Sequence, residues 1–374
     1  MSTSSDEEDS GIVLDNGSHR IKAGFSGDDS PRSIFRTIVG TTFNEEARTY
    51  GKLPRHFCIG DEAIKNSLDI KKPIERGIVT NWEAMEAVWS HVFDDLRVKV
   101  SDHNVLLTEP QMNPLSNREK MAEVMFEKFQ PLGLHVMSPT VLSLYASGRL
   151  SGLVIDSGFE VTSVSCIYEG HKVVQSIFRS DIGGNDVTHY LIELLGKRGY
   201  SFTTTKEIED VSLLKERCAY VSRNPATENM ENVRKGYTYS NGTSISVDYE
   251  RFQCMEAMFN PSLIGSDLCG IHDLIIKSIQ ACPVNVRGDI CRNIILSGSN
   301  TMVMDIATRI DLELKKVLPA EIKVVSPPER RSSTWIGGSV VASLSSVQDK
   351  WIRPSDYEEF GPNIVWRPQF TLFG

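Results

Sequence analysis

The chain has 374 residues, of which 40% are hydrophobic and 24% charged, so it is long enough for about two domains with substantial cores. Its 40 basic and 49 acidic residues give a formal net charge of −9, which excludes a protein-wide basic field for binding nucleic acid. The composition also excludes collagen, coiled-coil and largely disordered chains. No apolar run approaches the ~20 residues of a membrane-spanning helix, so no membrane span is expected.

Seven cysteines are scattered along the chain. They form no Cys-x-x-Cys pair and have no spacing typical of a zinc site or a disulfide framework. They are interpreted as reduced thiols, mostly buried, in a reducing compartment. The N-terminus is acidic, whereas a signal peptide begins with positive charge. These features favour the cytoplasm, with the nucleus as the alternative.

The first predicted element is a hairpin. Residues 1–10 form an acidic tail, after which Gly11–Asp15 reads as a buried strand that ends in a carboxylate. Asn16, Gly17 and Ser18 form a turn, and a second strand follows over Ile21–Phe25. Asn-Gly between two β-rich runs is a strong hairpin signal.

Helical patterns follow the hairpin. Apolar side chains recur on one face over Asn81–Trp89, and Asn117 is expected to cap a helix over Arg118–Phe129. Pro139 suits the first position of a helix that runs to Tyr145. Stretches rich in Pro and Gly around residues 40–56, 222–243 and 353–374 are interpreted as surface loops or tails.

The hairpin pattern then occurs a second time. Gly152–Asp156 reads as a strand ending in a carboxylate, Ser157 and Gly158 as a turn, and Val161–Ile167 as the return strand. Two distant copies of one unit predict a duplicated architecture with two similar α/β domains. Near the C-terminal end, Asn293–Met302 reads as a strand that enters a loop of small residues and then a helix.

These hairpins carry residues suited to a nucleotide polyphosphate. A tight turn directs backbone N–H groups towards an anion, Ser18 adds a hydroxyl and Lys22 a positive charge. Asp15 and Asp156 are candidates for holding Mg²⁺ through its water shell. The small residues around Gly298 would let a ribose and base approach the backbone. One Asp-x-Gly turn is common in purely structural hairpins, so the prediction depends on the combination.

The chain resembles the actin family from end to end. The strings that carry the resemblance are Asp15-Asn-Gly-Ser18 with Lys22-Ala-Gly-Phe25, Pro73–Trp82, Leu106–Pro110, Val141–Arg149, Arg198–Thr205, Pro327–Arg330 and Trp335–Gly338. The resemblance implies the actin/hexokinase/Hsp70 ATPase fold, with two duplicated α/β domains around a nucleotide cleft. The expected domains are 11–140 plus 335–374, with a small subdomain at about 37–72, and 141–334, with one at about 184–260.

The resemblance also implies ATP or ADP with Mg²⁺ as the cofactor. Ser18 and Lys22 would contact phosphates, with Gly17 in the same loop, and Asp15 and Asp156 would face the hydrated metal. The remaining residues implied at the nucleotide are Gly158 and Val161 in the second phosphate loop, Gly184 on the ribose side, and Lys215, Glu216, Gly298, Met302 and Arg331 around the adenosine.

The chain departs from the actin pattern at this site. Phe159 replaces a carboxylate and Glu160 a glycine, so Glu160 is expected either to repel phosphate or to extend into solvent. Actins order the attacking water with a glutamine and a histidine, at whose positions this chain has Pro139 and Ser163. The resemblance therefore implies at most a slow ATPase.

The preferred function is an actin-related cytoskeletal protein that binds nucleotide, hydrolyses it poorly or not at all, and assembles with or caps actin-fold filaments. Its expected partners are other actin-fold subunits and actin-binding proteins, with no direct nucleic-acid contact. The alternatives are a divergent conventional actin that forms filaments and hydrolyses ATP, and a nuclear actin-related subunit of a chromatin-remodelling complex. A metabolite kinase of the same fold is disfavoured by the actin-specific strings.

Overall fold

The computed structural model describes residues 10–43, 55–66, 69–228, 233–239, 242–318 and 321–367. The predicted acidic tail, except Ser10, and parts of the predicted loops at 40–56, 222–243 and 353–374 lie outside these residues. The chain divides into two compact units, one formed by Met1–Gly148 with Ser332–Gly374 and the other by Arg149–Arg331. No helix among the described residues is both long and apolar enough to cross a bilayer.

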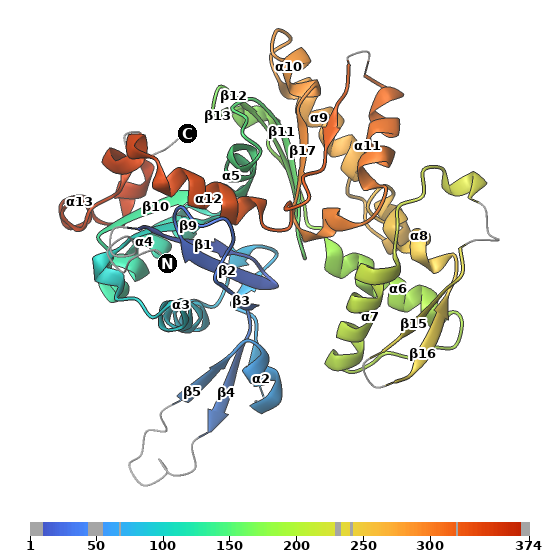
Figure 1. Cartoon of the computed structure of the whole chain (residues 1–374), viewed down its shortest axis with the longest axis horizontal. Helices are drawn as coiled ribbons and strands as arrows, with labels where there is room; N and C mark the ends of the chain where they lie inside the picture. Colours follow the sequence, from blue (N-terminus) through green and yellow to red (C-terminus); the bar gives the residue numbers. More distant parts are fainter. Residues whose placement is uncertain are drawn as a thin grey trace. The chain divides into compact units, whose positions relative to one another are not determined.

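The described part of the first unit is built on a five-stranded sheet in the order β10-β9-β1-β2-β3 (Figure 1). β1 pairs with β2 antiparallel and with β9 parallel, and β10 continues the parallel side. The predicted hairpin is therefore confirmed. The strands are β1 (Ile12–Asn16), β2 (Arg20–Phe25), β3 (Ser33–Arg36), β9 (Asn104–Thr108) and β10 (Gly133–Met137).

Helices cover both faces of this sheet. The helices are α3 (Trp82–Leu96), α4 (Leu115–Val124), α5 (Pro139–Ala146), α12 (Ser333–Ser343) and α13 (Pro354–Phe360). Because strand side chains alternate, Ile12 and Leu14 join the buried cluster that includes Trp89 of α3. Val13 lies on the opposite face, where α12 packs on β1 and against α5. The indole Nε1–H of Trp335 in α12 donates to Val13 O at 3.0 Å.

Smaller elements complete the first unit. A second sheet has the order β5-β4-β6, and β7 pairs with β8. The bounds are β4 (Val39–Phe43), β5 (Arg55–Ile59), α2 (Asp61–Asn66), β6 (Asp69–Lys71), β7 (Ile74–Glu75) and β8 (Ile78–Val79), with 3₁₀ helices at Val100–Asp102, Ser345–Lys350 and Gly361–Trp366 and a π-helical turn at Met125–Phe129.

The second unit contains a sheet of six described strands in the order β13-β12-β11-β17-β18, with β14 also paired to β12. β11 pairs with β12 antiparallel and with β17 parallel, so the second predicted hairpin is also confirmed. The strands are β11 (Gly152–Ser157), β12 (Thr162–Tyr168), β13 (His171–Lys172), β14 (Phe178–Ser180), β17 (Ile294–Ser297) and β18 (Val324–Val325), with a separate pair β15 (Lys235–Thr238) and β16 (Ser244–Val247).

The core of the second unit is a large apolar cluster that includes Leu153 and Ile155 of β11 and Ile275 of α9. The helices are α6 (Gly184–Gly196), α7 (Thr205–Cys218), α8 (Glu250–Glu256), α9 (Ile271–Ala281), α10 (Arg287–Cys291) and α11 (Ile306–Lys315), with 3₁₀ helices at Val174–Ser176, Pro225–Thr227, Pro261–Ile264 and Ser299–Met302.

The two main sheets share one topology. In each, two parallel strands (β10 and β9, or β18 and β17) lead to the first strand of a hairpin (β1 or β11), and the antiparallel return strand (β2 or β12) follows. Two parallel strands that lie side by side must be joined by a crossover connection. Two units with the same strand order are the arrangement expected of a duplicated α/β unit.

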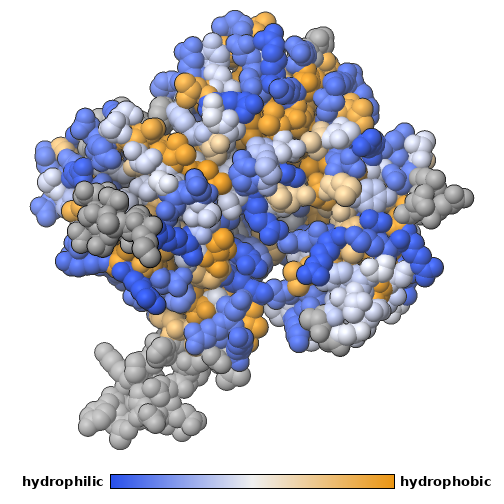
Figure 2. Space-filling view, in the orientation of Figure 1, coloured by the Kyte–Doolittle hydropathy of each residue, from blue (hydrophilic) through white to orange (hydrophobic). Residues whose placement is uncertain are grey.

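Two local predictions were wrong. Asn117 does not cap a helix, because α4 already begins at Leu115, after Pro114, and the Asn117 amide donates to Val79 O at 3.0 Å. The segments interpreted as loops contain regular structure, including β4, β15 and α13. The exterior in view is largely hydrophilic, with scattered apolar side chains (Figure 2).

Candidate functional site

The first hairpin carries a partly buried ion pair. Asp15 lies opposite Lys22 in the β1–β2 register, and Lys22 Nζ lies 2.7 Å from Asp15 Oδ2. Thr108, at the end of β9, donates its hydroxyl to Asp15 Oδ1 at 3.3 Å. Asp15 is only 7% exposed, so its carboxylate is held at the carboxyl end of the parallel strands, where α/β sheets bind ligands.

The turn of this hairpin requires glycine at position 17. A Cβ atom on Gly17 would lie 2.4 Å from the carbonyl oxygen of Arg20. The Gly17 carbonyl accepts from the Thr37 hydroxyl at 2.7 Å, and Ser18 Oγ accepts from the Gly77 N–H at 3.1 Å. Neighbouring segments of the same unit therefore hold the turn and orient the Ser18 hydroxyl.

The second hairpin is held by the first turn of α6. The Gly158 N–H donates to Val161 O at 2.9 Å, and the Gly184 N–H donates to Gly158 O at 3.0 Å. The Asn185 N–H donates to Phe159 O at 2.7 Å. A Cβ atom on Gly158 would meet only Val161 O, at 3.7 Å, so the backbone at Gly158 is open to close approach by a ligand.

The loop after β17 packs directly on this hairpin. Gly298 has φ +88°, and a Cβ atom there would lie 2.2 Å from Ser157 O and 2.9 Å from Asp156 Oδ1. Asn300 donates its side-chain amide to Ser157 Oγ at 3.0 Å. Both the backbone conformation and the lack of space therefore require glycine at 298.

A buried lysine lies beside the start of α6. Lys215 of α7 is 8% exposed, and its ammonium donates to Gly184 O and, at 2.8 Å, to Thr188 Oγ1. Burial lowers the pKa of Lys215 to about 8, although Cys254, Glu216 and Asp186 raise it in part. On the exposed side of the same helix, Glu216 pairs with Arg331 at 2.9 Å.

Most of the predicted site residues are thus brought together within their own unit. The first unit carries Asp15, Gly17, Ser18 and Lys22 on one hairpin. The second unit brings together Asp156, Gly158, Val161, Gly184, Lys215 and Gly298. In the same unit Glu216 and Arg331 form a separate pair, and Met302 lies at the end of a 3₁₀ helix. The contact residues Thr108 and Asn300 were not predicted. Thr108 is a polar residue at a strand end, as Asp15 is, and that signal was available in the sequence.

The positions expected to order water carry groups unsuited to that task. Pro139 is the first residue of α5, and its ring offers neither a donor nor an acceptor. Ser163 lies in β12 opposite Asp156 and is buried. Glu160 is only 7% exposed, so of the two alternatives given for it, extension into solvent is not what the structure shows.

Each unit, taken by itself, carries groups that suit a phosphate or a hydrated cation. The described residues contain no group of three or more His, Cys, Asp or Glu side chains able to hold a metal by themselves. Single carboxylates such as Asp15 and Asp156 suit Mg²⁺, which keeps several waters and takes further ligands from phosphates. Lys22 of the first unit suits a phosphate, and so, taken by itself, does the open backbone at Gly158 of the second unit.

Comparison with known proteins identifies the family of the chain. A family model described as Actin matches residues 6–370. An "Actin-like protein" of Neurospora crassa is 40% identical over 368 residues, which cover 95% of this chain and 96% of that protein. The chain therefore belongs to the actin family, and its helices and sheets form the α/β fold of the actin ATPases.

Proposed function

We propose that this protein is an actin-related cytoskeletal subunit that binds ATP or ADP with Mg²⁺, hydrolyses ATP slowly or not at all, and assembles with or caps actin-fold filaments or complexes. One observation carries the proposal: the same hairpin, with a strand-end carboxylate and a glycine turn, occurs at the same place in two sheets whose four corresponding strands have the same order and directions.

Proteins of the actin family generally bind a nucleotide with Mg²⁺. In the first unit Ser18 and Lys22 would hold phosphate oxygens, and in the second unit the open backbone at Gly158 would suit a phosphate as well. Asp15 and Asp156 would hold the hydrated cation, which supplies charge neutralisation for the phosphates. The Lys22 ammonium pairs with Asp15. A bound phosphate would therefore meet an ammonium group that Asp15 already holds in position.

Weak hydrolysis is proposed from Pro139 and Ser163. A water that attacks a phosphate needs a neighbouring group to orient it and to take up its proton. Pro139 has no such group, and the Ser163 side chain is short and buried. Positioned proton-transfer groups typically contribute ~10²–10⁴-fold in rate, so their absence would leave bound ATP largely intact.

The first experiment measures the bound nucleotide and its turnover. Nucleotide extracted from the purified protein should contain ATP with Mg²⁺, and phosphate release should be slow. Pro139→Gln combined with Ser163→His should raise phosphate release by at least ~10-fold, whereas each single change should do less. Rapid conversion of ATP to ADP by the unaltered protein would contradict the proposed weak hydrolysis.

A second variant pair tests the cation site. Asp156→Asn should weaken retention of nucleotide in the presence of Mg²⁺, because it removes a carboxylate from the proposed metal side. Asp181→Asn is the matched control, since Asp181 pairs with Arg179 at the surface at 2.8 Å. Equal retention by both variants would count against Asp156 in this role.

Assembly is tested by sedimentation with Mg²⁺ and salt, alone and with preformed actin filaments. The proposal expects little pelleting of the protein alone and a change in filament length or co-sedimentation when filaments are present. Extensive self-assembly coupled to phosphate release would instead support the conventional-actin alternative.

A further inference from the structure

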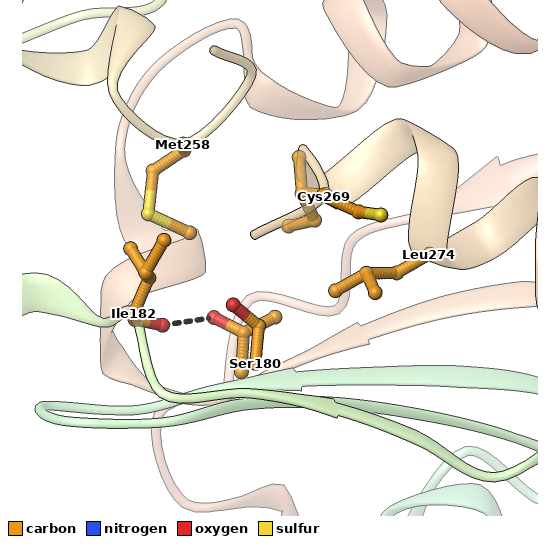
Figure 3. A pocket seen from close by; sticks show the side chains of 7 residues that line it. Ser180, Ile182, Met258, Cys269 and Leu274 are labelled. Carbon is orange, nitrogen blue, oxygen red and sulfur yellow. Dashed lines mark hydrogen bonds between the residues drawn. The ribbon is translucent and has the colours of Figure 1, made fainter. Parts of the chain in front are cut away.

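The small pocket in the second unit has room for about one water molecule (Figure 3). It is lined by Thr162, Ser180, Ile182, Met258, Cys269, Ile271 and Leu274. The Ser180 hydroxyl is buried and has no hydrogen-bond partner within the described residues, so a single water there would satisfy it. A larger ligand does not fit in this pocket.

In the first unit, two arginines face each other across β2 and β3. Arg20, the first residue of β2, lies directly opposite Arg36, the last residue of β3, in the antiparallel register. Residues in that position project from the same face of a sheet, with Cβ atoms about 5 Å apart, and like charges there destabilise the pair. Burial lowers the pKa of Arg36, Asp61 raises it, and the charge of Arg20 lowers it again.

The negative charges near this pair do not balance it. Arg36 Nε lies 2.7 Å from Asp61 Oδ1, whereas Arg20 is exposed and forms no hydrogen bond or ion pair with another described residue. Lys22, two residues further along β2 on the same face, pairs with Asp15 at 2.7 Å. Three cations and two carboxylates therefore leave this face of the hairpin with one net positive charge.

A phosphate group suits the two arginines better than a single carboxylate does. A guanidinium group presents its N–H donors in a planar fork that matches the oxygens of a phosphate. A dianion between the two forks would replace their mutual repulsion with attraction to both. The face is also accessible, because Ile34, which lies opposite Lys22 in the same register, is 47% exposed.

We propose that Arg20 and Arg36 form a phosphate-binding site on the exposed face of β2 and β3, with one phosphate group held between their guanidinium groups. Inorganic phosphate and the terminal phosphate of a nucleotide held at Lys22 offer the same chemistry. Only the second source rests on the function proposed above. The experiment therefore has one arm for each source.

The first arm measures thermal unfolding of the full chain with inorganic phosphate. In chloride, Arg20→Met should melt at the same temperature as the unaltered protein or higher, because it removes a like-charge contact. Phosphate at the same ionic strength should raise the melting temperature of the unaltered protein, as a ligand of the folded state does, and leave Arg20→Met and Arg36→Met nearly unchanged. Arg223→Met is the matched control, because Arg223 is exposed and pairs with Asp305 at 3.0 Å in the second unit. It should respond to phosphate as the unaltered protein does.

The second arm measures the release of ATP from the same proteins in the presence of Mg²⁺. If the arginine pair holds the terminal phosphate, Arg20→Met and Arg36→Met should each speed release about tenfold or more, as expected for loss of a charge-assisted hydrogen bond. Arg20→Lys should fall in between, because lysine keeps the charge but lacks the fork.

The two arms separate failure of this site from failure of the proposed function. A protein that binds no nucleotide but loses its response to phosphate in Arg20→Met and Arg36→Met would contradict the proposed function and support the site. A change in ATP release without a response to inorganic phosphate would assign the site to the nucleotide. If the Arg20 and Arg36 variants match Arg223→Met in both arms, the site is overturned.

Discussion

Lys215→Met should stabilise the protein near neutral pH and destabilise it in strong alkali. Lys215 carries its ammonium in a buried position, and burial lowers its pKa from 10.5 to about 8. At 1.36 kcal/mol per pH unit, that difference means that the folded chain loses about 3 kcal/mol by keeping this lysine charged at pH 7. Methionine has a similar length and no charge, so the substitution removes this cost.

The substitution also removes two hydrogen bonds. The ammonium donates to Gly184 O and Thr188 Oγ1, but the Thr188 hydroxyl already donates to the same carbonyl at 2.9 Å. The net loss is therefore close to that of one ordinary hydrogen bond, about 1 kcal/mol. At pH 7 the variant should be more stable by about 2 kcal/mol.

The sign of the effect depends on pH. Between about 8 and 10.5 the unfolded chain keeps the Lys215 proton while the folded chain loses it, so this group makes stability rise with pH. At pH 10.5 half of the unfolded chains still hold this proton, and well above that pH both states of the unaltered protein carry a neutral lysine. The variant should then be less stable by about 1 kcal/mol, the value of the lost hydrogen bond.

The assay is denaturant unfolding of both proteins without added nucleotide at pH 7, 8, 9, 10 and 10.5, followed by a signal from the second unit. Lys206→Met is the control, because Lys206 lies on the same helix but is exposed. The difference in unfolding free energy should change sign for Lys215→Met and stay near zero for the control. A difference that is constant with pH would refute the reasoning.

Three further predictions concern the first unit. Burial and then the charge of Arg118 lower the pKa of His135 to about 3. Between pH 7 and 4.5 the unfolded chain therefore gains a proton on His135 that the folded chain does not, and the free energy of unfolding should fall by about 3 kcal/mol. In denaturant titrations, His135→Phe should remove most of that fall. Gly337→Ala should lower the melting temperature strongly, because the new Cβ atom would lie 1.8 Å from a carbonyl oxygen of α5. Gly196→Ala is the control and should be neutral or stabilising, because a Cβ atom at that helical position would meet no atom within 4 Å. Lys22→Met should cost about 3 kcal/mol by leaving its buried carboxylate partner without a cation, and adding Asp15→Asn should recover much of this loss in a double-mutant cycle.

The sequence predicted the elements whose signals are local. Gly11–Asp15 and Ile21–Phe25 are β-rich runs around an Asn-Gly turn, and β1 and β2 begin and end within one residue of them. The helix at Asn81 was equally readable, because Asn81 caps α3 by accepting from the Ala84 N–H.

Elements without a local signal were missed. β15 is short, and its side chains are mostly exposed, so it shows no alternation of apolar and polar residues. α4 begins at Leu115 because Pro114 precedes it, although Asn117 is the better capping residue by type. A tertiary contact takes up the Asn117 side chain instead, since its amide donates to Val79 O.

The candidate site residues could be named from the sequence, whereas the contacts among them could not. Asp15 and Lys22 are close in sequence and their pairing follows from hairpin register. The contact of Thr108 with Asp15 joins residues 93 positions apart. The burial of Lys215 against Gly184 depends on how α6 and α7 pack. Residue type alone does not reveal these relations.

The backbone of the second hairpin explains how its chemistry can change while the fold persists. Its turn is held by main-chain hydrogen bonds from Gly158 to Val161 and from Gly184 and Asn185 to the carbonyls of Gly158 and Phe159. None of these bonds uses the side chain of residue 159 or 160. These main-chain bonds therefore do not depend on which side chain stands at position 159 or 160. Position 298, by contrast, must be glycine, because any side chain there would collide with Ser157 O.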